Sequence, residues 1–382
     1  MSRPFLPLLA RQLEPTGFLA GFAISSYFLG RLFIELPSGS FADKIGRRIP
    51  IISGSLCSMI GAVICSLAVS IYSLILGLTI WGLGTALFFT SSMILVIKLS
   101  EPHSRGRAIG YFQAVEFVGI FAGSPIGGFV AQYLDYTSVF YISGALICAV
   151  FLTVTFFSED LKQLDSDPVK SLRLHTRFSI KKSIKQLENW PVATLCTASF
   201  SRMIITQGIV STILPIYLND FLTMTTGLIG IVIGIRTLGL CLGAALCHSI
   251  VSKMGQKPTV VGAMLTSSLF VCLYSLAHSF ESSLALAFAE GFGAGIVSVI
   301  LVLLIPQHVT QESTGSAIGL YRTFMDLGGF VGPILMMTMY ATFNIQTGFL
   351  LGAIFLASSA VTLSILKIQH CTLLPKNNLQ GH

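Results

Sequence analysis

The chain has 382 residues, of which 53% are hydrophobic and only 10% are charged, with 23 Lys and Arg against 16 Asp and Glu. Soluble domains carry about 25% charged residues, so this composition excludes an ordinary soluble protein and indicates one embedded in lipid. There is no low-complexity tract and no strongly charged tail, which argues against a disordered scaffold or a nucleic-acid binder.

Eleven apolar segments are long enough to cross a bilayer, which takes about 20 helical residues. They lie at residues 17–38, 49–69, 72–97, 106–133, 137–157, 190–218, 226–251, 258–278, 282–305, 314–342 and 345–366. A long polar stretch at 158–189 separates the first five from the last six. We therefore predict an all-α, polytopic membrane protein with an N-terminal bundle at 1–157, a cytoplasmic central loop at 158–189, and a C-terminal bundle with a short tail at 190–382.

The positive charges are distributed unevenly between the two sides. Seventeen of the 23 Lys and Arg fall in alternate loops and in the tail, and the positive-inside rule makes those loops cytoplasmic. The basic balance thus indicates membrane orientation and gives no sign of a nucleic-acid partner. The eight Cys are scattered without a Cys/His cluster, so we expect neither a metal site nor a disulfide framework.

The two halves repeat. Residues 44–48 match 253–257, and the same offset of 209 aligns Gly82 with Gly291 and Gly119 with Gly328. Parallel repeats of this kind are typical of transporters with a substrate site between two bundles. Residues 5–8 resemble 213–216, near the end of a helix that starts about 24 residues earlier. We therefore expect a twelve-helix design from which most of the first helix is missing; a chain that truly has eleven helices is the alternative.

The loop after the first complete helix reads Gly-Ser-Phe-Ala-Asp-Lys-Ile-Gly-Arg-Arg. This resembles the signature between helices 2 and 3 of the major facilitator superfamily, which implies two six-helix bundles and assigns conformational gating to Gly39, Asp43, Lys44, Gly46, Arg47 and Arg48. A glycine allows close helix approach or a turn, and a carboxylate such as Asp43 is favoured at a helix N-terminus. A solvated charged turn is the alternative.

A second motif is similar to the helix-5 signature of the superfamily's proton-antiporting exporters. Its residues are Gly110, Gly119, Gly123, Pro125, Gly127 and Gly128, with the proline one place later than in the family pattern. Close helix packing by small residues is the other interpretation. The arginine that many of these exporters carry on helix 4 is absent, since Leu78 stands there, so we exclude proton coupling through that position.

Charged residues inside the apolar segments are the candidates for binding protons and substrate, because such residues usually line a cavity or pair with each other. They are Arg31, Glu35, Glu116, Arg202, Arg236, Glu290, Arg322 and Asp326. Two pairs, Arg31 with Glu35 and Arg322 with Asp326, are four residues apart and share a helix face, so a structural ion pair is an equal alternative for them. We place Asp326 and Glu116 first as proton carriers, while Arg202 and Arg236 suit an anionic substrate.

Together these features predict a secondary transporter, not an enzyme, that exports a small amphipathic compound in exchange for protons by alternating access. We expect a cofactor-free monomer in a bacterial plasma membrane, with lipid, protons and a small molecule as partners and no nucleic acid. Symport uptake of an organic anion is the first alternative. A truncated membrane protein that does not transport is the second.

Overall fold

The computed structural model describes residues 1–14, 17–45, 48–101, 104–159, 186–310 and 313–366; for residues 35–45 we describe the backbone only. The described chain is helical. The N-terminal half contains η1 (Arg3–Phe5), α1 (Leu6–Leu13), α2 (Gly17–Ile45), α3 (Arg48–Ser66), α4 (Ile71–Leu99), α5 (Arg105–Tyr133) and α6 (Tyr136–Phe156). The C-terminal half contains η3 (Gln186–Glu188), α9 (Trp190–Met203), η4 (Ile204–Ile213), α10 (Leu214–Asp220), α11 (Thr226–Met254), α12 (Gln256–Leu273), η5 (Tyr274–Leu276), α13 (Phe280–Leu304), η6 (Ile305–Gln307), α14 (Thr314–Thr342) and α15 (Ile345–Ile365).

Eleven of the described helical stretches are long and apolar enough to span a membrane, as the sequence predicts. The ends differ where a helix continues beyond its apolar part: α2 runs to Ile45, seven residues past the predicted end. The span predicted at 190–218 is not one regular helix. Its middle, Ile204–Ile213, is a π-helix between α9 and α10. Such wide turns occur frequently at functional sites, and hydropathy cannot reveal them because it carries no information on helical pitch.

The helix boundaries repeat at the offset of 209 that the glycines predict. The pairs α2 and α11, α5 and α14, and α6 and α15 begin and end 209 residues apart. Their caps are equivalent too. Ser70 and Ser279 form the same capping box at the starts of α4 and α13, and Asp135 and Asn344 accept a backbone hydrogen bond at the starts of α6 and α15. Local capping chemistry thus sets the same boundaries in both halves.

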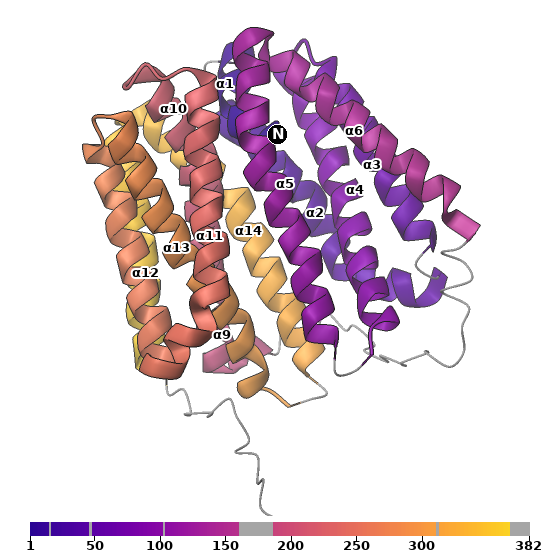
Figure 1. The fold of residues 1–382 in the computed structure, drawn as a ribbon, viewed down its shortest axis with the longest axis vertical. Coiled ribbons are helices and arrows are strands. Elements are labelled where there is room, and N and C mark those ends of the chain that lie inside the picture. The colour runs from indigo at the N-terminus through magenta and orange to yellow at the C-terminus, as the bar shows by residue number, and fades with distance from the viewer. Residues whose placement is uncertain (15–16, 46–47, 102–103, 160–185, 311–312, 367–382) are drawn as a thin grey trace, which may run out of the picture.

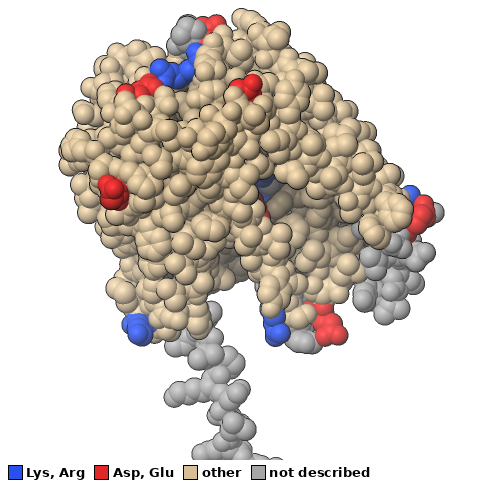
Figure 2. Space-filling view, turned by 45° about the horizontal axis from the view of Figure 1, so that its top comes forward, with Lys and Arg blue, Asp and Glu red and all other residues tan. Residues whose placement is uncertain are grey.

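The helices form two bundles that meet along two seams (Figure 1), one where α2 packs on α14 and one where α5 packs on α11. Both seams are tight toward the ends that the distribution of basic loops predicts to be extracellular. Gly128 and Ser124 on α5 are buried there, whereas residues 113–116 and 118–122 nearer the cytoplasm are exposed. Figure 2 shows the consequence: a hollow between the two halves, with charged groups inside, that opens toward the lower end of the view.

Candidate transport site

An ion pair joins α2 of the N-terminal bundle to α14 of the C-terminal bundle. Arg31 of α2 donates through Nε to Oδ1 of Asp326 of α14, at 3.1 Å. Asp326 is 1% exposed. The sequence offered pairs four residues apart within one helix; the pair seen here links residues 295 apart in sequence and holds the two bundles together. The side chain of Glu35, the predicted neighbour of Arg31, lies outside the described residues.

Glu116 is a carboxylate on α5, within the exposed stretch of that helix. It lies within the electrostatic reach of Arg3, Arg31 and Arg322, and its side chain is exposed. In the described part of the chain no salt bridge involves Glu116. Arg322, on α14, directs Nη2 toward Sδ of Met93 on α4, at 3.7 Å. The structure therefore brings predicted residues from α2, α5 and α14 to one cavity.

Arg3 belongs to this cluster although the sequence reasoning did not select it. Its guanidinium carbon is 4.3 Å from the ring centroid of Tyr27 and 5.9 Å from that of Phe28, a cation–π geometry. Tyr27 in turn is 2.7 Å from Thr85 Oγ1 through its hydroxyl. Arg3 is exposed. A signal was available: Arg3 stands just before residues 5–8, which the repeat matches to residues near the end of a membrane helix.

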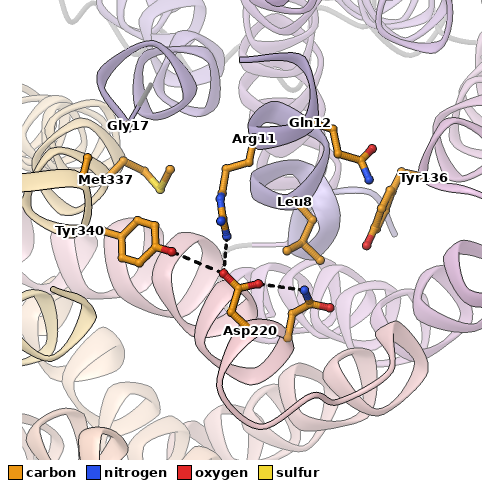
Figure 3. A pocket seen from close by; sticks show the side chains of 10 residues that line it. Leu8, Arg11, Gln12, Gly17, Tyr136, Asp220, Met337 and Tyr340 are labelled. Carbon is orange, nitrogen blue, oxygen red and sulfur yellow. Dashed lines mark hydrogen bonds and ion pairs between the residues drawn. The ribbon is translucent and has the colours of Figure 1, made fainter. Parts of the chain in front are cut away.

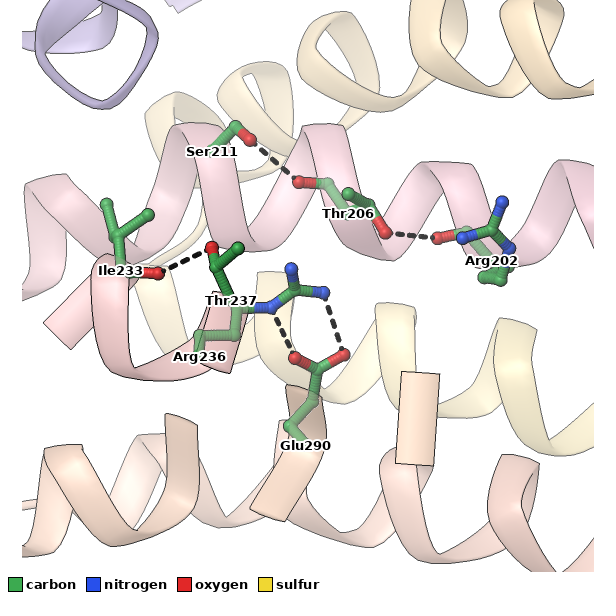
Figure 4. A network of polar contacts seen from close by, with 7 residues as sticks. All are labelled: Arg202, Thr206, Ser211, Ile233, Arg236, Thr237 and Glu290. Carbon is green, nitrogen blue, oxygen red and sulfur yellow. Dashed lines mark hydrogen bonds and ion pairs between the residues drawn. The ribbon is translucent and has the colours of Figure 1, made fainter. Parts of the chain in front are cut away.

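Two other predicted residues form a salt bridge with each other inside the C-terminal bundle. Arg236 of α11 binds Glu290 of α13 at two points (Figure 4), Nε to Oε2 at 2.5 Å and Nη2 to Oε1 at 3.1 Å. They are 6% and 1% exposed. Both guanidinium and carboxylate are committed to this pair, so neither faces the hollow as an open binding group.

Arg202, on α9, also lies in the C-terminal bundle. Its Nη2 lies 3.6 Å from Sδ of Met325 on α14, and its buried Nε has no hydrogen-bond partner in the described chain. Arg202, Ser267 and Glu290 line a gap of about 10 Å³, roughly the volume that one water requires. The gap is too small for a substrate, and an anion site at Arg202 and Arg236 stays a prediction.

The extracellular end is closed by a polar cluster (Figure 3). Arg11 of α1 donates to Asp220 of α10 at 2.6 Å, Tyr340 of α14 donates to the same carboxylate at 3.4 Å, and Asn219 donates at 3.0 Å. The Arg11 guanidinium also lies 5.3 Å from the Tyr340 ring centroid. Outside this cluster is a vestibule of about 570 Å³, lined by both bundles, with Tyr136 on its wall.

Arg11 and Asp220 occupy equivalent places in the two repeats. Each stands six residues before the helix that follows, Gly17 for one and Thr226 for the other, and they are 209 residues apart. A residue that touches its own repeat counterpart must lie close to the pseudo-twofold axis that relates the bundles. The ion pair therefore lies close to this axis and joins the two bundles at their extracellular end.

The helix-5 motif divides into an open and a packed part. A side chain at Gly110 or Gly119 would meet nothing within 4 Å, whereas one at Gly128 would strike the backbone of Thr226 on α11. Gly123 and Gly127 face Met1. Pro125 lies inside α5, which continues through it, and its side chain faces Gly234 of α11. The packed part forms the seam between the bundles.

Part of the gating motif can be placed. Gly39, Asp43 and Lys44 lie on the last turns of α2, where the side chains are outside the description, and Gly46 and Arg47 lie outside the described residues. Arg48 begins α3 and donates to Glu159 at 2.8 Å and to Ser158 at 3.1 Å, which joins α3 to the chain after α6.

Comparison with known proteins agrees with this architecture. The family model of the Major Facilitator Superfamily matches residues 1–221 and 193–370. The chain belongs to the major facilitator superfamily. Two relatives of this superfamily member are resistance proteins by name. Quinolone resistance protein NorA of Staphylococcus aureus is 22% identical over 379 residues, 98% of this chain and 94% of the relative. Multidrug resistance protein MdtG of Enterobacter lignolyticus is 24% identical over 392 residues, 99% and 90% of the two chains. The protein is a multi-pass membrane transporter.

Proposed function

We propose that this transporter exports a small amphipathic compound from the bacterial cytoplasm in exchange for protons, by alternating access. The observation that carries the proposal is the hollow between the bundles, open at one end (Figure 2), together with the exposed carboxylate of Glu116 on α5. The resistance proteins among its relatives support the outward direction. Their bacterial origin supports a place in the plasma membrane.

Alternating access requires the contacts between the bundles at the extracellular end to separate. Small residues and one exposed ion pair make these contacts. The outer seam consists of small residues in contact, as where Gly21 of α2 meets the carbonyl of Pro333 and Gly230 of α11 meets that of Ser124. Beyond it lies the Arg11–Asp220 pair, whose side chains are 30% and 28% exposed. Exposed ion pairs contribute only about 0–1 kcal/mol, so this pair adds little to the free energy needed to open the extracellular end.

Glu116 is the best-placed proton carrier. Asp326 and Glu290 are each bonded to an arginine. Glu116 is exposed to the cavity and is influenced by three arginines without a salt bridge to any of them in the described structure. Water from the cytoplasm can therefore deliver or remove its proton.

Uptake of an organic anion by symport is the second candidate, and Arg3 is the observation that favours it. Its guanidinium faces the cavity and is held over Tyr27. In symport the anion and the proton would travel together, so transport into right-side-out vesicles would rise with an inward proton gradient. Export by exchange predicts the opposite polarity.

The test is proton release from energised inverted vesicles challenged with cationic, zwitterionic and anionic aromatic compounds. Exchange predicts compound-dependent proton release that Glu116→Gln removes. Glu281→Gln, at an exposed carboxylate on the extracellular end of α13, is the matched control and should leave release intact. If Glu116→Gln retains the full proton signal, Glu116 is not the carrier. Asp326→Asn then becomes the variant that decides between the remaining carboxylates.

A further inference from the structure

Two buried polar atoms in the C-terminal bundle have no hydrogen-bond partner in the described chain, and both belong to residues that line one gap. They are Nε of Arg202 on α9 and Oγ of Ser267 on α12. Ser267 is 3% exposed. Buried polar groups in folded proteins nearly always have a partner, which is either a protein group or an ordered water. Two such atoms at the same gap indicate a polar molecule bound between them.

The third polar residue of the gap is Glu290 on α13. Each of its carboxylate oxygens accepts one hydrogen bond from Arg236 (Figure 4). A carboxylate oxygen can accept a second bond, so Glu290 has acceptor capacity left. The rest of the lining is apolar and consists of Ile205, Ala294, Val297 and Leu356. The gap therefore offers a guanidinium donor, a hydroxyl and a charged acceptor within apolar surroundings.

Size and charge both limit what this gap can hold. Its volume is about 10 Å³, and a single buried water needs about 10–15 Å³ and makes about three hydrogen bonds. A metal cation there would lie beside the guanidinium of Arg202, and an anion would lie beside the carboxylate of Glu290, so either would meet a like charge. A neutral molecule of one heavy atom that both donates and accepts hydrogen bonds fits on both counts.

We propose that one water molecule binds in this gap, accepts hydrogen bonds from Arg202 Nε and Ser267 Oγ, and donates one to the carboxylate of Glu290. Glu290 then pairs with two arginines, with Arg236 directly and with Arg202 through the water. Arg202 lies two residues before Ile204, where the π-helix η4 begins. The water therefore connects the start of this wide turn to α12 and α13, and Arg202 is a positioning residue for it.

Two substitutions at Ser267 distinguish a gap that holds water from a dry one, because the order of their melting temperatures reverses. Ser267→Ala keeps room for the water and leaves it two protein partners. Ser267→Val places a methyl group in the gap and excludes the water, so Arg202 Nε loses its partner. We expect the valine variant of the full chain to melt at a lower temperature in detergent than the alanine variant. In a dry gap the added methyl group would fill a void and the valine variant would melt higher, which overturns the proposal.

Thr266→Ala and Thr266→Val are the matched controls, because Thr266 is exposed on the same helix. The difference between their melting temperatures measures the helix propensity of valine against alanine and is subtracted from the difference at Ser267. A high-resolution density map of the parent protein gives a second readout that needs no variant to fold. We expect one water peak within hydrogen-bond distance of Arg202, Ser267 and Glu290. A gap without density, or a serine hydroxyl bonded elsewhere, contradicts the proposal.

Discussion

The two bundles have the same backbone plan and different interiors. By the offset of 209, Tyr27 and Trp81 of the N-terminal bundle correspond to Arg236 and Glu290 of the C-terminal bundle. The crossings match as well: a side chain at Gly82 would strike the carbonyl of Tyr27, and the equivalent Gly291 faces the carbonyl of Arg236.

At that shared crossing the N-terminal bundle has aromatic side chains and the C-terminal bundle has an ion pair. Tyr27 reaches from α2 to Thr85 on α4 and supports Arg3, whereas Arg236 reaches from α11 to Glu290 on α13 and ends there. The repeat therefore determines where helices cross, and the residues at the crossing determine whether a charge is buried or presented to the cavity. At this crossing the N-terminal bundle holds the exposed Arg3, and the C-terminal bundle buries Arg236 and Glu290.

The largest expected effect comes from breaking the buried pair. Glu290→Ala or Arg236→Ala leaves one charge uncompensated in the bundle interior and should cost about 3–5 kcal/mol of stability. The double variant Arg236→Met with Glu290→Met should recover most of the loss, because an apolar pair of similar volume can replace a buried ion pair. Thermal unfolding in detergent measures this. A single variant that melts with the parent would show that the pair is not structurally committed.

The two outer seams should respond alike to the same change. A Cβ at Gly21 would lie 2.8 Å from the Pro333 carbonyl oxygen, and one at Gly230 would lie 2.5 Å from that of Ser124. Valine at either position should therefore hold the extracellular ends apart, at a cost to the closed state of about 1–3 kcal/mol. The readout is the rate at which an impermeant thiol reagent labels Met337→Cys from outside.

Gly262→Val is the control for both seams, since a side chain there meets nothing within 4 Å. Both seam variants should raise the labelling rate and slow transport, and the control should do neither. An effect at one seam alone would mean that the two seams do not open together.

The on-axis ion pair allows an exchange of charges between equivalent positions. Arg11→Asp alone and Asp220→Arg alone place like charges at the extracellular closure, and each should slow transport by about 2- to 5-fold, since exposed pairs contribute about 0–1 kcal/mol. The double variant restores opposite charges in nearly equivalent surroundings and should regain most of the rate. A double variant as slow as the singles would contradict a gate at this pair. High salt should reduce all three differences.

The smallest effect concerns the caps of α6 and α15. Asp135→Ala and Asn344→Ala each remove an N-cap acceptor, worth about 0.5–2 kcal/mol. Hydrogen bonds from the Ser138 backbone hold the pKa of Asp135 below its usual value, so its contribution is present at neutral pH and is lost as the pH falls through that lowered pKa. Asn344 does not titrate. Melting curves at neutral and acid pH should show an acid-dependent loss that Asp135→Ala removes and Asn344→Ala retains.

Much of the fold was predictable because its signals are local along the chain. Hydropathy predicted eleven spans, basic loops indicated the cytoplasmic side, and the glycines around 82 and 291 predicted the offset that the helix boundaries follow. The superfamily motifs led to the family that the comparison identifies. These properties depend on composition and spacing, which a sequence displays directly.

Tertiary structure decided which charges meet. Arg31 and Asp326 are 295 residues apart and Arg236 and Glu290 are 54 apart, and spacing along one helix cannot show how two helices are rotated against each other. Nor could it show that Glu116 stays exposed. The sequence by itself determined the span number, the repeat and the inventory of intramembrane charges. Helix packing alone decided which of them are paired and which face the cavity, because pairing depends on distances across the bundle.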